Sequence, residues 1–214
     1  KSSKRLVVVA PTGVAAINAG GVTIHSFFQL PFSPFVPDAH IKSRFDFSKE
    51  KRKIIRTLDL LVIDEISMVR CDVLDAIDSV LRRFRDHAKP FGGVQLLLIG
   101  DLQQLTPVVT HEEEHILSQY YDTALRRLDY VTIELSRVYR QQDASFINFL
   151  NAVRTNQATE DHLRRLNERY DPSFRPPAES GYIRLTTHNR MADDYNQSQL
   201  HSLRGAPFCY RAEV

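Results

Sequence analysis

Short apolar runs recur along the chain and predict buried β-strands. Five such runs occupy residues 6–10, 58–64, 94–100, 131–135 and 182–187. The apolar residues in them are mostly continuous rather than alternating with polar ones, which is typical of strands buried on both faces. Strands of that kind belong to parallel sheets, so the pattern predicts a mostly parallel sheet.

Helical periodicity fills the intervals between these runs, most clearly over residues 71–88. The apolar stripe of this segment consists of Val73, Leu74, Ile77, Val80, Leu81 and Phe84, and we expect its Asp and Arg residues to face away from the core. Strands that alternate with helices are joined by right-handed crossovers. The alternation therefore predicts a three-layer α/β domain.

Two proline-containing segments, 30–39 and 171–180, predict long loops. A new strand and a new helix are predicted after the second segment, so we interpret 171–180 as a linker between domains. This predicts a first domain over residues 1–170 and the beginning of a second over 181–214. The part after the linker is too short to form a compact domain alone, so we expect the second domain to be truncated here.

Composition narrows the class of protein only modestly. The chain has 214 residues and a formal net charge of +2, which by itself does not indicate a nucleic-acid-binding protein. Cys71 and Cys209 form no C-x-x-C motif, so a reducing compartment is expected. There is no apolar run long enough for a membrane span and no signal-peptide layout, which predicts a soluble intracellular protein unless a targeting segment precedes Lys1.

The segment LLVIDEISMV, residues 60–69, ends its first apolar stretch at two adjacent carboxylates, Asp64 and Glu65. The carboxyl edge of a parallel sheet is where α/β proteins bind ligands. In nucleotide hydrolysis an Asp at this place holds Mg²⁺, usually through water, and the neighbouring Glu deprotonates the attacking water. The alternative is that these acids only end a strand and cap the next helix.

Further polar residues follow the next two predicted strands. Asp101, Gln103 and Gln104 come after the third run, and an amide side chain can donate to a phosphate oxygen while accepting from water. Arg137 and Arg140 come after the fourth run and could neutralise charge on a transferring phosphoryl group. Taken alone, each arginine is better explained as an ordinary surface residue.

Taken together, several segments resemble the Pif1-like helicases, superfamily-one DNA motors related to RecD. They are APTGVAA, TIHSFF, VIDEISMV, KPFGGVQLLLIGDLQQLTPV and LSRVYRQ, in the family's order between residues 6 and 141. The stretch from Asp64 to Val108 is the most specific part. The later segment RLTTHNRMADDYN resembles the opening of a second motor domain more loosely.

The resemblance implies a RecA-like P-loop NTPase fold that uses ATP and Mg²⁺ to move five-prime to three-prime on single-stranded DNA and to unwind duplexes. It implies that Asp64 binds Mg²⁺ through water and that Glu65 is the catalytic base. Gln104 would sense the terminal phosphate, Arg140 would contact that phosphate, and Asp101 would belong to the same nucleotide-binding site. Because Gln103 is adjacent, the sensing amide is assigned either to Gln104 or to Gln103. We expect a monomer without a membrane, in the nucleoid of a bacterium or in a eukaryotic nucleus or mitochondrion.

The same resemblance implies contacts with single-stranded DNA, which such motors grip by its phosphates and bases. The candidate residues are Thr12, Gly13, Thr23, His25, Ser26, Phe27, Thr187, His188 and Asn189. We expect Phe27 to stack on a base. The alternative is that at least one of Phe27 and Phe28 belongs to the core, and that His25 is a structural histidine.

The phosphate-binding motif G-x-x-x-x-G-K-[ST] is absent, since none of the eight glycines precedes a lysine. Such a loop follows a strand and opens a crossover helix, and a crossover takes a dozen or more residues. The first apolar run already begins at residue 6, so we expect the strand, loop and helix upstream of Lys1. This chain alone should then bind ATP poorly. The alternative function is a non-catalytic nucleic-acid or protein binding module with a degenerate motor fold, but the intact acids, amide and arginine argue against decay.

One further motif fits a zinc site by spacing. Residues 111–115, HEEEH, match H-E-x-x-H. Three consecutive Glu residues also suit the positive N-terminal end of a helix. We favour this second interpretation and predict the first turn of a helix here.

Overall fold

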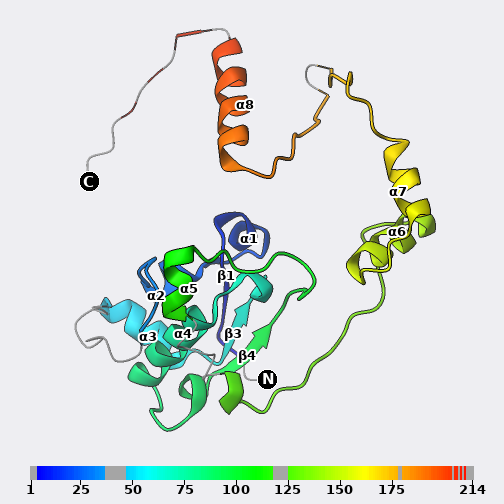
Figure 1. Cartoon of the computed structure of the whole chain (residues 1–214). Helices are drawn as coiled ribbons and strands as arrows, with labels where there is room; N and C mark the ends of the chain where they lie inside the picture. Colours follow the sequence, from blue (N-terminus) through cyan, green and yellow to red (C-terminus); the bar gives the residue numbers. More distant parts are fainter. Residues whose placement is uncertain are drawn as a thin grey trace. The chain divides into compact units, whose positions relative to one another are not determined.

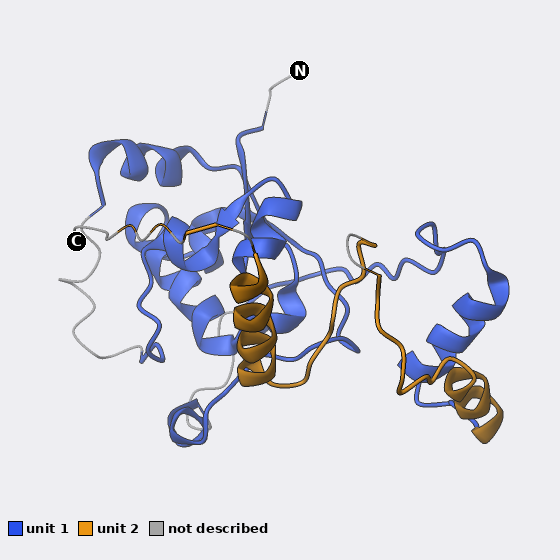
Figure 2. Ribbon diagram, turned by 90° about the horizontal axis from the view of Figure 1, so that it is seen from above, with its two compact units in different colours: residues 1–159 blue, residues 160–214 orange. Residues whose placement is uncertain are grey.

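The computed structural model describes residues 4–36, 47–117, 125–177 and 180–203, with residues 205, 206, 208 and 210. The chain divides into two compact units, residues 1–159 and 160–214 (Figure 2). The segment 171–180, which we expected to link two domains, therefore falls within the second unit. The assignment of two motor domains stays a prediction.

The first unit contains a four-stranded parallel sheet. Its strands are β1 (Leu6–Ala10), β2 (Val22–Thr23), β3 (Leu60–Ile63) and β4 (Gln95–Leu98), in the spatial order β2-β1-β3-β4. Figure 1 labels β1, β3 and β4 of this sheet. Val7 lies opposite Leu61, which lies opposite Leu96. The first three predicted runs are thus confirmed as strands of an α/β fold.

Helices lie on both faces of this sheet. The first crossover, α1 (Gly13–Asn18), joins β1 to β2, whereas α4 (Cys71–Phe84) joins β3 to β4 in the opposite direction across the sheet. Right-handed connections that step in opposite directions place their helices on opposite faces. The helices α2 (Ile24–Phe28) and α3 (Lys49–Thr57) contribute to the same core as α4, which gives three layers.

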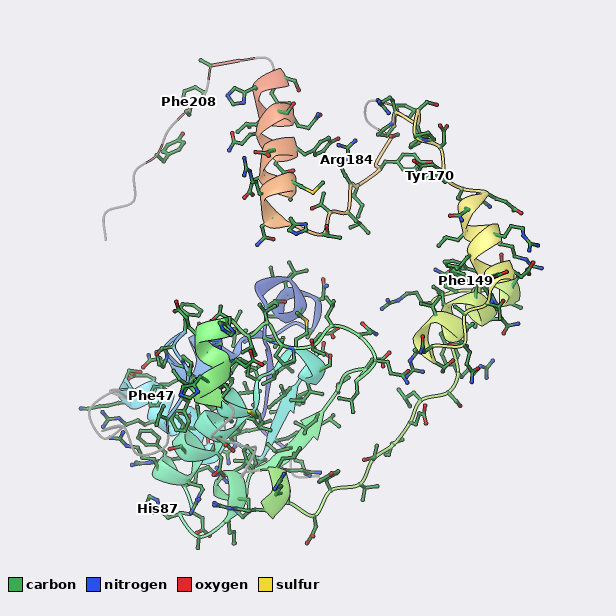
Figure 3. The ribbon with its side chains drawn as sticks, viewed as in Figure 1. Phe47, His87, Phe149, Tyr170, Arg184 and Phe208 are labelled. Carbon is green, nitrogen blue, oxygen red and sulfur yellow. The ribbon has the colours of Figure 1, made fainter. Side chains whose placement is uncertain are left out.

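The main core forms between the sheet and α4. Leu61 and Ile63 of β3 are fully buried there, as are Ile77 and Leu81 of α4. The predicted apolar stripe is confirmed, since Phe84 also packs against this core and the centroid of its ring lies 5.3 Å from that of Phe47. Figure 3 labels Phe47 among the side chains of this unit. The helix ends at Phe84 rather than at residue 88, because the backbone leaves the helical region at the next residue.

The expectation that the Asp residues of this helix face away from the core is wrong. Asp72, Asp75 and Asp78 are 1%, 9% and 7% exposed. Asp72 accepts hydrogen bonds from the Arg70 guanidinium and from the backbone N–H of Phe35. Buried carboxylates are tolerated when such donors are present. Asp72 therefore attaches neighbouring loop segments to α4.

Two of the predicted strands do not form. Residues 131–135 and 182–187 have no strand partner among the described residues. Their apolar side chains are largely exposed, with Ile133 at 79% and Leu185 at 86%. A strand needs the backbone groups of a neighbour, and an apolar run without one remains irregular.

The remaining helices lie after the sheet. They are α5 (His111–Leu117) and α6 (Ala144–Arg154) in the first unit, and α7 (Glu160–Asn167) and α8 (Asn189–Ser202) in the second. In the part of the chain that the structure describes, no helix has both the length and the apolar character that a bilayer crossing requires.

A short 3-10 helix, η3 (Pro90–Gly93), precedes β4 and packs against α4. Its Phe91 is fully buried, and the N–H of Phe91 donates to the Asp78 carboxylate. Gly92 has a φ of +61°, and a Cβ there would lie 2.7 Å from the carbonyl oxygen of Leu81. Close approach to the backbone of α4 therefore requires glycine at this position.

We expect Gly92→Ala to destabilise the full-length protein by about 2 to 4 kcal/mol, from left-handed backbone strain plus overlap with α4. Gly20→Ala is the matched control, because Gly20 has a similar φ of +66° and open space around its Cβ position. The control should cost only about 1 to 2 kcal/mol. Urea unfolding measures both, and equal costs for the two variants would contradict the close approach.

Candidate functional site

The carboxyl edge of the sheet gathers most of the candidate residues of the first unit. Parallel strands all end at one edge, and ligands of α/β proteins bind there. Asp64 and Glu65 follow β3, and Asp101 follows β4 by three residues. Thr12 and Thr23 lie at the ends of β1 and β2. The order β2-β1-β3-β4 therefore places the acids on one half of this edge and the threonines on the other.

Backbone contacts hold the ends of β3 and β4 together beyond the sheet itself. The N–H of Ile99 donates to the carbonyl of Ile63 at 2.9 Å, and the N–H of Ile66 donates to the carbonyl of Ile99 at 2.9 Å. A Cβ at Gly100 would lie 3.0 Å from the backbone nitrogen of Ile66. The absence of a side chain at Gly100 thus lets Asp101 follow directly beside the turn that carries the acids.

The acidic pair lies on a constrained turn. The N–H of Asp64 donates to the carbonyl of Val9 at 2.9 Å, and Asp64 Oδ1 accepts from the N–H of Glu65 at 3.0 Å. Glu65 adopts a left-handed backbone, with φ 52° and ψ 46°. A non-glycine residue held this way carries strain of about 1 to 3 kcal/mol, and such residues cluster at functional sites.

The charge of the pair suits a divalent cation. Among the described residues, no basic side chain forms an ion pair with Asp64 or Glu65. Mg²⁺ is typically held by one or two carboxylates together with substrate phosphates and water. Asp64 therefore fits the expected metal-binding role, and the neighbouring Glu65 carboxylate is left able to accept a proton.

Asp101 has a different environment from the one expected. Its Oδ1 accepts from the N–H of Gln103 at 3.1 Å, and its Oδ2 accepts from Nε2 of Gln104 at 3.1 Å. Arg154 donates to both oxygens at 3.2 Å. These bonds, led by that from Gln103, lower the pKa of Asp101 below its ordinary value. Protein donors thus occupy both oxygens, and the expected nucleotide contact of Asp101 stays a prediction.

The sequence pattern gives no indication of Arg154 and leaves the sensing amide open between Gln103 and Gln104. Only the side chain of Gln104, and not that of Gln103, is hydrogen-bonded to Asp101. Arg154 lies 53 positions from Asp101, on the last turn of α6. An arginine in an ordinary helical pattern gives no local signal of such a distant partner.

Arg140 is not brought to this group of residues by any contact. It is exposed, in an irregular segment before α6. No interaction among the described residues joins it to Asp64, Glu65 or Gln104. Its neighbour Arg137 lies 4.9 Å from the ring centroid of Tyr139. The role of Arg140 at a terminal phosphate therefore stays a prediction.

On the other half of the edge, both threonines cap helices. Thr12 Oγ1 accepts from the N–H of Ala15 at 3.2 Å, and Thr23 Oγ1 accepts from the N–H of Ser26 at 3.2 Å. Gly13 and Ser26 lie within the short helices that these residues begin. Capping accounts for both hydroxyl groups. Phosphate contacts by Thr12, Gly13, Thr23 and Ser26 stay predictions.

The expected base contact of Phe27 is wrong. Phe27 is 6% exposed and Phe28 is fully buried, so both rings belong to the core. Phe32 is instead 85% exposed, and its ring stacks on that of His25 with centroids 5.1 Å apart and an interplanar angle of 20°. Phe32 lies in the predicted proline-containing loop, but a loop prediction does not say which apolar side chains are exposed, since Leu30 of the same loop is 8% exposed.

The charge state of His25 follows from its surroundings. Burial lowers the pKa of His25 below its ordinary value, the Arg70 charge lowers it further, and Asp72 opposes the shift. The imidazole is therefore neutral at pH 7. A neutral, partly buried ring beside Phe32 is suited to stacking rather than to pairing with a phosphate.

Arg70 joins the start of α4 to the start of α5. Its guanidinium contacts Asp72 at 2.9 Å and Glu113 at 2.7 Å. Glu113 Oε2 also accepts from the N–H of Thr110 at 3.0 Å. The expected helix start at His111 is confirmed. Glu113 thus serves an ion pair that anchors the end of the loop carrying Gln104.

In the second unit, the three candidates form a local helix start. His188 is the N-cap residue of α8, and Asn189 is the first residue of that helix. Thr187 Oγ1 lies 2.9 Å from His188 Nδ1. Their proposed contact with DNA stays a prediction.

Several known proteins that are similar in sequence to this chain belong to one family of helicases. A sequence model described as PIF1-like helicase matches residues 1–163. The ATP-dependent DNA helicase PIF1 of Rattus norvegicus is 35% identical over 213 residues, which cover 96% of this chain and 32% of that protein. The ATP-dependent DNA helicase Pif1 of Campylobacter jejuni is 30% identical over 223 residues, which cover 100% of this chain and 48% of that protein. The chain thus spans less than half the length of these relatives.

Solved structures agree with the sequence matches. The Pif1 helicase from Bacteroides in complex with ADP-AlF3 and ssDNA has a TM-score of 0.88 and 41% identity, over 96% of this chain and 49% of that one. The Pif1 helicase from Candida albicans has a TM-score of 0.74 and 29% identity, over 94% of this chain and 45% of that one. These similarities confirm the RecA-like α/β fold. With a family match over residues 1–163, the chain belongs to the PIF1-like helicase family.

Proposed function

We propose that the full-length protein is an ATP-dependent DNA helicase that moves five-prime to three-prime on single-stranded DNA and unwinds duplexes. The proposal rests on the acidic pair Asp64 and Glu65, which has no basic partner among the described residues. Backbone hydrogen bonds connect this pair to the Asp101–Gln104 turn at the same sheet edge. The relatives named as ATP-dependent DNA helicases and the Bacteroides complex support it.

At the ends of β3 and β4, each step of nucleotide hydrolysis is assigned to one group. Asp64 would hold Mg²⁺ through water, and the ion would supply positive charge beside the transferring phosphate. The Glu65 carboxylate orients the attacking water and accepts its proton. The Gln104 amide donates to a terminal phosphate oxygen or accepts from that water. Arg140 contacts the same phosphate, by resemblance to the family.

The proposed DNA contacts lie at the ends of β1 and β2. Thr12 and Gly13, with Thr23 and Ser26, begin two helices whose first turns offer N–H and hydroxyl donors to phosphates. The exposed Phe32 ring, supported by His25, replaces Phe27 as the platform for a base. In the second unit, Thr187, His188 and Asn189 would extend the track.

The wider organisation follows from the same proposal. Residues 1–170 belong to the first motor domain and residues 181–214 begin the second, with 171–180 as the linker. The protein works as a monomer. It acts where the DNA is, in the nucleoid of a bacterium or in the nucleus or mitochondrion of a eukaryote.

Glu65→Gln in the full-length protein should lower the DNA-stimulated rate of ATP hydrolysis by about 10²- to 10⁴-fold, the range for loss of a general base. Nucleotide affinity should remain. Glu112→Gln is the control, because Glu112 is an exposed carboxylate on α5. Steady-state hydrolysis with and without oligo(dT) measures both, and a Glu65→Gln enzyme as fast as the wild type would remove the base assignment.

Phe32→Ala should weaken binding of oligo(dT) by about tenfold, since a stacked base contributes roughly 1 to 3 kcal/mol. Phe32→Trp should retain most of the affinity, because it keeps an aromatic face. Phe208→Ala is the matched control, since Phe208 is also 85% exposed. Fluorescence anisotropy measures the affinities. An equal loss in both alanine variants, or none in Phe32→Ala, would argue against the platform.

A further inference from the structure

Arg154 reaches from the C-terminal turn of α6 to the residue that holds Gln104. Its Nε lies 3.2 Å from Asp101 Oδ2, and its Nη2 lies 3.2 Å from Asp101 Oδ1. The two bonds form the fork-to-carboxylate arrangement that fixes both the position and the plane of a carboxylate. Arg154 is the only described basic side chain that pairs with Asp101.

The Asp101 carboxylate in turn determines which way the Gln104 amide points. Gln104 Nε2 donates to Asp101 Oδ2 at 3.1 Å. An ionised carboxylate only accepts hydrogen bonds, so rotating the amide by half a turn would set two oxygens against each other. The amide oxygen and the second N–H of Gln104 therefore remain available to a water and to a phosphate oxygen.

Asp101 without Arg154 would be less firmly placed. Its side chain is 23% exposed, and the remaining donors are the backbone N–H of Gln103 and the Gln104 amide itself. The Gln103 bond holds only Oδ1. Without Arg154, Asp101 Oδ2, which accepts the hydrogen bond from Gln104, would be free to turn toward solvent. Arg154 is the donor that holds Oδ2 from outside the turn.

The helix that supplies Arg154 begins close to Arg140. Its N-cap is Asp143, whose carboxylate accepts from the backbone N–H groups of Ser145 and Phe146. An α-helix is a rigid element with a rise of about 1.5 Å per residue. One short helix therefore lies between the arginine expected at the terminal phosphate and the arginine bound to Asp101.

We propose that Arg154 is a positioning residue for the sensing amide: it fixes Asp101, and through Asp101 it keeps Gln104 turned toward the terminal phosphate and the attacking water. This inference rests on the proposed helicase function. It gives the arginine no contact with substrate. Its effect should therefore fall on the rate of hydrolysis and not on the binding of ATP or DNA.

The energetics separate this role from a purely structural one. The side chain of Arg154 is 41% exposed, and exposed ion pairs typically contribute little to stability. Loss of the pair should leave thermal unfolding nearly unchanged. Misplacing a group at a reacting centre by about 1 Å can cost on the order of 10²-fold in rate. A large kinetic effect beside a small stability effect is the expected signature.

The test uses the full-length protein with ATP and oligo(dT). Arg154→Ala should lower the DNA-stimulated kcat by about tenfold, with KM for ATP and Kd for oligo(dT) within about twofold of wild type. Arg154→Lys should restore part of the rate, because an ammonium group can replace one of the two bonds. Arg164→Ala is the matched control, since it removes an exposed arginine from Asp161, also at 3.2 Å, on α7.

A double-mutant cycle identifies the route of the effect. In a Gln104→Ala background, Arg154→Ala should cause no further loss of kcat, because the amide it positions is already gone. The same loss in both backgrounds, an unchanged kcat, or a change confined to KM or Kd would overturn the proposal. If Arg154→Ala unfolds, Arg154→Lys and Arg154→Gln carry the same comparison.

The outcomes also separate this inference from the proposed function. A wild-type protein without DNA-stimulated ATP hydrolysis would contradict both the proposed function and the positioning role of Arg154. An active wild type that Glu65→Gln inactivates, together with an Arg154→Ala variant as fast as the wild type, would remove the positioning role alone.

Discussion

Parallel pairing of β1, β3 and β4 is the constraint on which the rest of the first unit depends. Because the three strands run in one direction, their carboxyl ends meet at one edge, and residues far apart in sequence become neighbours there. Asp64 and Asp101 are brought together in this way, and the backbone bonds of Ile99 continue the link beyond the sheet. The pairing of β1 with β2 then adds Thr12 and Thr23 to the same edge.

The buried carboxylates of α4 have a second, less expected part in this arrangement. Asp72 anchors the N–H of Phe35, close in sequence to the exposed Phe32, and binds Arg70. Arg70 extends the same network to Glu113, at the end of the loop that carries the sensing amide. One network at α4 therefore fixes the segment that we propose to contact DNA and the end of the loop that we propose to contact nucleotide. Removing one buried charge from such a network leaves its partner without compensation, so a single substitution there destabilises the fold.

The sequence by itself determined the features that arise from local patterns. Continuous apolar runs located the strands around residues 6–10, 58–64 and 94–100, since each run is visible in the sequence without knowledge of its neighbours. The expected burial on both faces is wrong for β4, where Leu97 is 47% exposed. The 3.6-residue stripe located α4, and the glutamates located the start of α5. The acids at 64 and 65 could be placed at a sheet edge because a strand end and its next residues are covalently adjacent.

Only the tertiary structure decided which equivalent patterns find partners. The run at 131–135 looks like the others, yet it stays irregular because no neighbouring strand supplies hydrogen bonds among the described residues. Leu30 and Phe32 belong to the same predicted loop, yet Leu30 is buried and Phe32 is exposed. Arg154 and Asp101 meet across 53 positions. Pairing energy depends on distance in space, and a sequence specifies that distance only through the complete packing of the chain.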